Sequence, residues 1–455
     1  MTGAILFLMQ SLLQAKTTFP GPNMSPSESK VPGKRSTKPK KLEGWKWDVT
    51  IFDRPGWSTP WIAGPKLVED EILVQCISHP EDIYYDDWYA EDSETVTLSS
   101  TDGGLSWTET SNERIACGVT NSSDDFVVDV STCSALTDEE TQERKQRLEA
   151  AGLGHLYDTT LGSGPSGWLI YPDSMASELK AKGYSVFDEH PIIPEGQAAV
   201  YARAIQARYS TNRGETWIDA DIQGLPVFGH GPVPNGSLEL SDGTRLEIFY
   251  GCELHEQMRS VYVLRSTDRG LNWNTVKIPA DPDLSLTEAS IVAFLGGRVH
   301  MMMRCDVGGD GYIYSTNSDD SGLTWSLAKR TPIQGQPLLL LKLRDGGILC
   351  TYCHRSFPAG IRACLSYDEG ESYDIENEKI LRDDVIPGPW ISPCGPPSIE
   401  LADGSIFTVY TLPKVTQLKP GETADGGLFC VRPKYHCYVA GSRYTLDYVR
   451  PLPGK

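Results

Sequence analysis

Short apolar runs separated by glycine-containing turns recur along most of the chain. In four places an apolar run, a D-G or G-G turn and a second apolar run follow one another, at residues 238–250, 291–303, 340–352 and 399–410. β-Branched and aromatic residues dominate these runs, and apolar and polar positions alternate within them, which is typical of β-hairpins. The pattern therefore predicts a chain built largely from repeated hairpins.

A second motif, S-x-[DN]-x-G-x-[TSN]-[WY], interleaves with the hairpins. It begins at Ser100, Ser210, Ser266, Ser318 and Ser366. The Asp or Asn side chain can bond backbone N–H groups two residues on, and the glycine can supply a positive φ. The aromatic residue leaves the turn and can be buried against a neighbouring layer. We therefore expect a rigid turn between two strands at each site.

The spacing of the motif predicts a six-bladed β-propeller. The last four copies are separated by 56, 52 and 48 residues, which leaves room for about four strands in each period. We place the first blade at about 61–110 and the second at about 160–217. The sixth, 392–448, has the hairpin but lacks the turn motif. Residues 45–52 are expected to supply a strand that closes the ring against the sixth blade.

The fold class predicted is thus all-β, with a small helical insertion. The propeller is expected to span 45–450, and the insertion about 111–190. Residues 137–152 and 173–185 within it have amphipathic helical patterns. Residues 1–44 precede the propeller as a separate segment.

The first residues are open to two interpretations. Residues 5–13 are apolar and as long as a signal-peptide core, but no Lys or Arg precedes them, and they are too short to span a membrane. Residues 16–42 are rich in Pro, Ser and Lys, as in a disordered linker. We predict a degenerate signal or anchor and hence a secreted or periplasmic protein, with a cytoplasmic location as the alternative.

Charge limits the partners. The net charge is −20, and because residues 1–48 hold eight Lys and Arg against three Asp and Glu, the rest of the chain carries −25. A body this acidic argues against nucleic acid as a partner. No dinucleotide-binding glycine motif or P-loop is present, and the single C-x-x-C has no second pair at zinc spacing. We therefore expect neither a cofactor nor a metal; the sequence does not indicate the oligomeric state.

The five turn motifs and their period resemble the Asp boxes of the sialidase (neuraminidase) superfamily over about residues 50–450. The resemblance implies a six-bladed propeller whose site lies at the mouth of the ring, away from the boxes. It also implies glycosidase chemistry on a glycan. In that chemistry three arginines bind a sugar carboxylate, a Glu activates a tyrosine nucleophile, and an Asp is the acid/base.

Carried over to this sequence, the resemblance assigns Glu288 and Arg304, in "LTEASIVAFLGGRVHMMMR", to the activating Glu and the second arginine. The third arginine is Arg355 or Arg362. The acid/base is expected in the loop "HPEDIYYDDWYAEDSE", where Asp87 is favoured and Asp86 comes next.

Two family positions are filled by other residues. The first arginine is expected near Ala63, with Arg54 as a substitute from an earlier position. The nucleophilic tyrosine is expected where the chain has Gly395 or Pro396, and neither Tyr352 nor Tyr410 matches well.

Three functions remain open. The first is an exo-acting hydrolase of terminal sialic acid or a related acidic sugar, with Asp87 as acid and Glu288 as base or nucleophile. The second is a polysaccharide lyase acting on uronates, using His79, His230, His354 or Tyr352 as base and Arg355 on the carboxylate. The third is a non-catalytic glycan-binding propeller in which Trp57, Trp61 and Trp88 stack on sugar rings.

Overall fold

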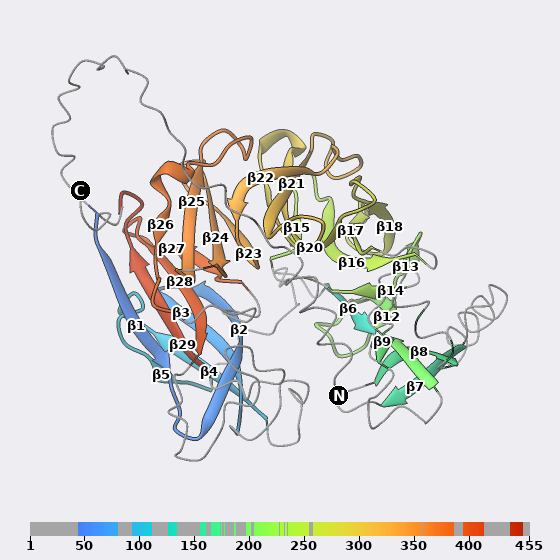
Figure 1. The fold of residues 1–455 in the computed structure, drawn as a ribbon, viewed down its shortest axis with the longest axis horizontal. Helices are drawn as coiled ribbons and strands as arrows, with labels where there is room; N and C mark the ends of the chain where they lie inside the picture. Colours follow the sequence, from blue (N-terminus) through green and yellow to red (C-terminus); the bar gives the residue numbers. More distant parts are fainter. Residues whose placement is uncertain are drawn as a thin grey trace, which may run out of the picture.

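The computed structural model describes most of the chain from residue 44 onward. The described residues are 44–80, 93–111, 126–133, 155–160, 165–172, 174, 177, 186–187, 197–201, 204–226, 228–231, 233, 235–253, 258–356, 358–385, 395–413 and 437–448. They form an all-β, six-bladed propeller, as the repeats predict (Figure 1). No helix among them is long and apolar enough to cross a membrane.

Blades one, four and five have the predicted four-stranded plan. In each, four antiparallel strands are paired in chain order. Blade one consists of β2 (Trp57–Val68), β3 (Glu71–Pro80), β4 (Glu94–Ser100) and β5 (Thr108–Glu109). Blade four consists of β19 (Ser285–Ala293), β20 (Val299–Val307), β21 (Tyr312–Ser318) and β22 (Lys329–Gln334). Blade five consists of β23 (Leu338–Lys342), β24 (Ile348–His354), β25 (Gly360–Ser366) and β26 (Lys379–Ile380).

Blade six takes its outer strand from the start of the propeller. β27 (Ser398–Glu400), β28 (Ile406–Pro413) and β29 (Cys437–Tyr444) are followed in the sheet by β1 (Lys46–Phe52). The predicted closing strand is confirmed. The Asp box is the turn between the third and fourth strands of a blade, and here those strands are not consecutive in the chain, which explains why blade six has no box.

Blades two and three differ from the regular plan. Blade two has three described strands, β6 (Val127–Cys133), β11 (Ala204–Ser210) and β12 (Ile218–Asp219). In blade three, β16 (Arg245–Cys252), β17 (Ser260–Ser266) and β18 (Asn272–Lys277) follow an inner strand in two pieces, β14 (Phe228–His230) and β15 (Ser237–Glu239). β13 (Asp221–Gln223) adds to its outer edge in parallel with β18.

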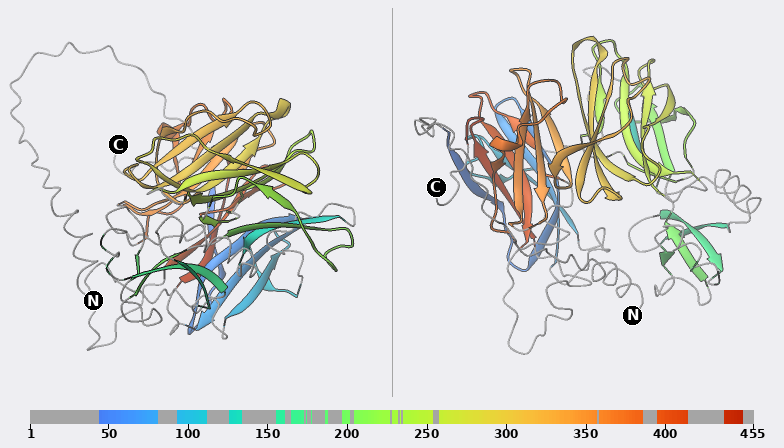
Figure 2. Two further views of the ribbon diagram at one scale, coloured as in Figure 1. Left: turned by 90° about the vertical axis from the view of Figure 1, so that its right-hand side faces the viewer. Right: turned by 45° about the horizontal axis from the view of Figure 1, so that its top comes forward.

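The structure adds a sheet near the insertion that the sequence pattern does not predict. β7 (His155–Thr160), β8 (Pro165–Pro172), β10 (Gln197–Tyr201) and β9 (Val186–Phe187) form a four-stranded antiparallel sheet, which lies outside the ring (Figures 1 and 2). Blade two therefore begins at β6 and not near residue 160. The predicted helix at 137–152, and all but two residues of that at 173–185, lie outside the described residues.

Each Asp box is closed by its own side chains. In the first, Asp102 Oδ1 accepts hydrogen bonds from the backbone N–H groups of Leu105 (3.0 Å) and Ser106 (2.9 Å), and Ser100 Oγ accepts one from Gly104 N (2.9 Å). The Ser106 hydroxyl and these backbone donors lower the pKa of Asp102 to about 2. The other four boxes repeat the Ser–Gly bond, and Asn212 replaces Asp in blade two.

The box glycine also lets neighbouring blades approach closely. A Cβ added at Gly104 would lie 2.5 Å from the ring of Phe407 in blade six, and one at Gly370 would lie 2.5 Å from the ring of His300 in blade four. Gly270 and Gly322 likewise face Val128 and Leu246 of the preceding blade. The box therefore fixes both a turn and the packing of one blade on the next.

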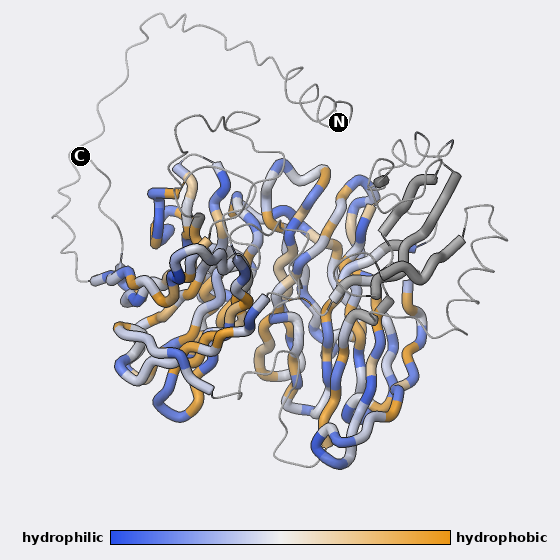
Figure 3. The backbone as a smooth tube through the Cα atoms, turned by 90° about the horizontal axis from the view of Figure 1, so that it is seen from below, coloured by the Kyte–Doolittle hydropathy of each residue, from blue (hydrophilic) through white to orange (hydrophobic). Residues whose placement is uncertain are grey.

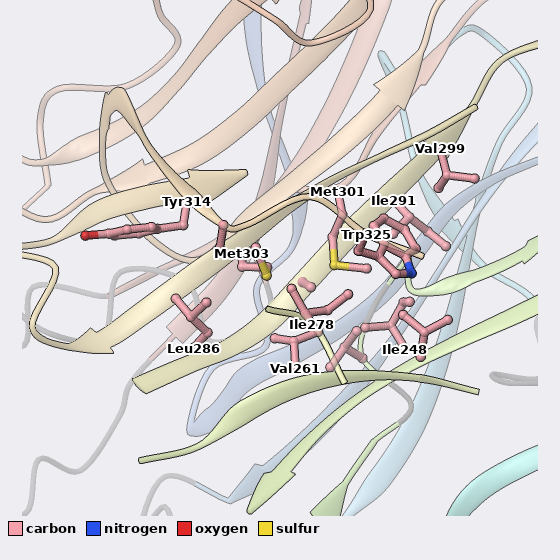
Figure 4. Packing of buried hydrophobic residues seen from close by; sticks show 14 of the residues in the cluster. Ile248, Val261, Ile278, Leu286, Ile291, Val299, Met301, Met303, Tyr314 and Trp325 are labelled. Carbon is pink, nitrogen blue, oxygen red and sulfur yellow. The ribbon is translucent and has the colours of Figure 1, made fainter. Parts of the chain in front are cut away.

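Apolar layers fill the spaces between blades. Figure 3 shows apolar and polar residues alternating along many strands. In β20, by contrast, both faces are buried. Met301 and Met303 pack with Ile248 and Val261 of blade three (Figure 4), while Met302 packs in the layer shared with blade five. Each such side chain contributes about 1.5–3 kcal/mol on burial. Because successive side chains of a strand point to opposite faces, a strand that is buried on both faces, such as β20, needs a continuous apolar run.

Polar contacts tie the inner strands of blades three, four and five together. The Asn235 amide donates to Ser290 Oγ at 2.8 Å and to the Leu340 carbonyl at 2.7 Å. Leu340 N donates to the same hydroxyl at 3.0 Å. These bonds fix the three blades that carry the site described below.

We expect Gly104→Ala to lower the free energy of unfolding by about 2–4 kcal/mol. The new methyl would add strain at φ +89° and overlap the buried ring of Phe407. Gly346→Ala is the matched control, since Gly346 has φ +96° but nothing within 4 Å of its added Cβ; it should cost only about 1 kcal/mol. Urea denaturation measures both, and equal losses would contradict the packing role.

We also expect His300 to make stability depend on pH. Burial lowers the pKa of His300, which is bonded to Asn317 (2.7 Å) and Tyr373 (3.0 Å). His300 therefore binds a proton more readily in the unfolded chain than in the folded protein. Its contribution to the free energy of unfolding is complete above about pH 6.5 and falls as the pH drops below that value. His300→Gln should show a smaller loss between pH 7 and pH 5 in urea titrations. An identical slope in both proteins would refute this.

Candidate functional site

The ends of the second strands define one face of the propeller. β3, β16, β20, β24 and β28 are the second strands of their blades and, in a ring of equivalent hairpins, run in the same direction. Their carboxyl ends therefore lie at one face. The Asp boxes follow the antiparallel third strands and lie at the opposite face. Glu288, Arg304 and Arg355 all belong to the face without boxes.

Two irregularities in blade four bring charged side chains together. In the β19–β20 ladder, Thr287 and Glu288 lie opposite Arg304 alone, and Asp306 has no opposite residue. Bulges of this kind bend a strand and redirect its side chains, and they are frequent beside active sites.

Arg304 is fixed by two carboxylates. Its Nη1 donates to Glu288 Oε2 at 2.8 Å, and its Nε lies 2.7 Å from Asp306 Oδ1. The Thr287 hydroxyl donates to the other oxygen of Asp306 at 3.1 Å. Burial opposes the charge of Arg304, but the two carboxylates outweigh it and raise the pKa of this group. The described residues give Arg304 Nη2 no partner.

Arg355, just after β24, is largely buried and has no ion pair or hydrogen bond from its guanidinium to any described residue. Its buried Nε lacks a hydrogen-bond partner. Burial, and next the charge of Arg304, lower the pKa of Arg355. An anion bound at this face would offset both the burial of Arg355 and its repulsion by Arg304.

Arg362, the other arginine predicted for this role, is engaged elsewhere. Its Nη1 donates to Glu378 Oε2 at 2.7 Å, and its Nη2 donates to the Pro358 carbonyl at 3.2 Å. The Tyr352 hydroxyl donates to the same carboxylate. Arg362 therefore links the strands of blade five, and Arg355 is the one with donors available.

Blade three adds two residues that the sequence analysis missed. The ring of Tyr250 lies under the Arg259 guanidinium, 5.9 Å from its centroid, and Arg259 Nη1 lies 3.8 Å from Asp306 Oδ2. Burial, and next the charge of Glu288, raise the pKa of Tyr250. A signal for Tyr250 was available. On the second strand, the residue that pairs with the box serine is Arg245 in blade three and Val299 in blade four, and Tyr250 and Arg304 each lie five residues after it.

The remaining predicted residues fall into two groups. Arg54 forms ion pairs with Glu94 (2.6 Å) and Glu109 (3.6 Å), both in blade one, and no described contact joins it to the Arg304 cluster. His230 lies opposite Tyr250 in the β14–β16 ladder, so its backbone is beside the cluster. The side chains of His230 and Trp61, and all of Asp86 and Asp87, lie outside the described residues.

Neither Tyr352 nor Tyr410 takes the place of the expected nucleophile. Tyr352 is buried and bonded to Glu378, and Tyr410 is buried with its hydroxyl 2.6 Å from Ser442 Oγ. At the expected position, Gly395 packs against Leu338 and Leu339. The part of the chain that the structure describes also contains no His, Cys, Asp and Glu cluster suited to a metal.

Comparisons with known proteins agree with the predicted resemblance. The profile of a family described as "BNR repeat-like domain" matches residues 192–385. No curated protein matches the chain. A crystal structure of a protein of unknown function from Dyadobacter fermentans is 19% identical, covers 90% of this chain and 99% of that chain, and has a TM-score of 0.53.

Two sialidase structures are also similar, with lower scores. A mutant of the NanB sialidase from Streptococcus pneumoniae is 13% identical, covers 87% of this chain and 68% of that chain, and has a TM-score of 0.44. The phage phi92 endosialidase is 11% identical, covers 90% and 70%, and has a TM-score of 0.47. At 19% identity the Dyadobacter fermentans structure shows a likeness of fold alone, and the BNR repeat-like profile confirms the predicted repeats over residues 192–385.

The contrast between Arg355 and Arg362 is testable by stability. We expect Arg362→Ala to lower the free energy of unfolding by about 2–4 kcal/mol, because it removes the ion-pair partner of Glu378 and leaves that carboxylate with the Tyr352 hydroxyl alone. Arg355→Ala should leave it unchanged or raise it by about 1 kcal/mol, because an unpaired buried charge is removed. Thermal and urea denaturation distinguish the two. A loss in Arg355→Ala as large as in Arg362→Ala would show that Arg355 is structural.

Proposed function

We propose that this sialidase-type propeller is a glycoside hydrolase that removes a terminal acidic sugar, sialic acid or a relative, from glycans. The observation that carries this proposal is the largely buried guanidinium of Arg355, which has no hydrogen-bond or ion-pair partner among the described residues and lies at the same face of the propeller as the ion-paired Arg304. A buried cation without a partner costs free energy, so it is retained where a ligand supplies the opposite charge.

A carboxylate suits these donors well. Two oxygens can accept from Arg355 and from Arg304 Nη2 at once, and a planar guanidinium matches that geometry. Asp306 and Glu288 keep Arg304 in place before the substrate arrives, so little conformational freedom is lost on binding. The sugar ring would then lie over the end of blade four, next to Glu288.

Glu288 supplies the reactive carboxylate in this proposal. It accepts a hydrogen bond from Arg304 and retains a second oxygen, Oε1, for the substrate or for water. Paired with Asp87 as the acid, it acts as base or nucleophile, as two carboxylates do in many glycosidases. This assignment requires no tyrosine from blade six, where the chain has Gly395.

A lyase acting on uronates is the second candidate, because His354 directly precedes Arg355. Its Nδ1 lies 3.2 Å from the Pro358 carbonyl, so Nδ1 carries the proton and Nε2 keeps its lone pair. Burial, and next the charge of Arg362, lower the pKa of His354, which favours the neutral base. Tyr352, bonded to Glu378, is not available for this chemistry.

We expect the purified chain to release sugar from 4-methylumbelliferyl sialosides or other acidic glycosides. Glu288→Gln should lower kcat by about 10²- to 10⁴-fold, since it removes a reacting carboxylate and keeps the volume. Glu371→Gln, an exposed acid paired with Arg298 elsewhere in the ring, is the control and should remain active. Fluorescence release measures both.

Two outcomes would contradict the hydrolase, and a third would contradict the role of Glu288. An ultraviolet absorbance rise from an unsaturated uronate would identify the lyase. Retention on glycan columns without any product would identify a binding propeller. Full activity in Glu288→Gln would remove Glu288 from the mechanism.

A further inference from the structure

Arg259 and Arg304 share one carboxylate but are held very differently. Arg304 lies 2.7 Å from Asp306 and 2.8 Å from Glu288, and its side chain is 22% exposed. Arg259 lies 3.8 Å from Asp306, beyond hydrogen-bond distance, and its side chain is 48% exposed. The described residues accept no hydrogen bond from the Arg259 guanidinium. One arginine is fixed and the other is loosely placed.

The backbone of Arg259, in contrast, is anchored to blade four. Its carbonyl accepts from Leu286 N at 2.9 Å, and its N–H donates to Ser285 Oγ at 3.4 Å. The guanidinium extends from this fixed point over the ring of Tyr250. Only the side chain has freedom to move, and its reach covers the cluster formed by Asp306, Glu288 and Arg304.

The charges of the cluster favour an anionic ligand here. Arg259 and Arg304 share the carboxylate of Asp306, Arg304 also pairs with Glu288, and Arg355 adds a third guanidinium at the same face of the propeller. Arg304 and the Thr287 hydroxyl already contact the two oxygens of Asp306, so this carboxylate stays paired when Arg259 moves away. A partly exposed ion pair at this distance adds little to stability and is broken at little cost.

We propose that Arg259 is a specificity-determining residue that leaves Asp306 to bind an anionic group of the ligand, a carboxylate or sulfate on a sugar. This rests on the proposed function in that the ligand occupies the same site. Arg355 and Arg304 bind the ligand from blades five and four, and Arg259 closes on it from blade three. The cationic contacts of the site thus come from three consecutive blades.

The test is equilibrium binding to the full chain by calorimetry, with three probes: N-acetylneuraminic acid, its uncharged methyl ester, and D-glucuronic acid. We expect Arg259→Ala to weaken binding of the acids about tenfold, the loss of one charge-assisted hydrogen bond, and to leave the ester unchanged. Arg259→Lys should recover part of the affinity. Raising the salt to 1 M should reduce the difference in affinity for the acids between Arg259→Ala and the wild type.

Arg330→Ala is the matched control, because Arg330 is an exposed arginine of blade four that lies over Tyr312, 3.5 Å from its ring centroid. It should bind like the wild type. Wild-type affinity for the acids in Arg259→Ala, with loss in Arg355→Ala, would overturn the role of Arg259 and leave the proposed function standing. Glucuronic acid bound through Arg259, without sialic acid binding, would support Arg259 and overturn sialic acid as the substrate. Binding of neither acid to the wild type would overturn both.

Discussion

The close approach of one blade to the next at the Asp-box glycine is the constraint on which the rest of the propeller depends. The Asp carboxylate and the Ser hydroxyl close the turn, so the glycine is fixed in a left-handed conformation at a set place. Because it has no side chain, the buried ring or aliphatic chain of the preceding blade can lie directly against it. In blades one, three, four and five the same contact recurs, and it sets the angle between neighbouring sheets.

That regular scaffold allows an irregular site. Blades three, four and five are joined near their inner strands by Asn235 and Ser290, and apolar layers fill the spaces between them. The two irregularities in the β19–β20 ladder interrupt the pattern only at the end of blade four. Such a frame can sustain the cost of a largely buried Arg355 that has no partner among the described residues.

The parts of the fold that could be predicted from sequence are those encoded locally. The Asp-box turn needs only eight residues, and its period reveals the blades; the closing strand was found because residues 45–52 had no other partner in the count. The side sheet formed by β7 to β10 was not predicted, because the patterns at 137–152 and 173–185 indicated helices in the insertion and the strands between and beyond them were not recognised. Glu288, Arg304 and Arg355 were named from a resemblance, but the choice between Arg355 and Arg362 depends on Glu378, which lies in the segment just before β26. Tyr250 could have been found, because it occupies the strand position that Arg304 occupies in blade four. Arg259 approaches Asp306 only through the packing of blade three on blade four, and no local pattern contains that information.

The pairing of β1 with β29 has a consequence for biosynthesis. The Ser442 hydroxyl donates to Asp48, 394 residues earlier in the chain, and the two strands form part of one sheet. β1 therefore leaves the ribosome long before its partner exists, and its hydrogen-bonding edge must remain unpaired while five blades are made. Loop-closure entropy makes so distant a pairing slow, and an unpaired edge is prone to intermolecular association. Nascent chains of this protein thus have a period in which a chaperone that shields strand edges would improve the yield of monomer.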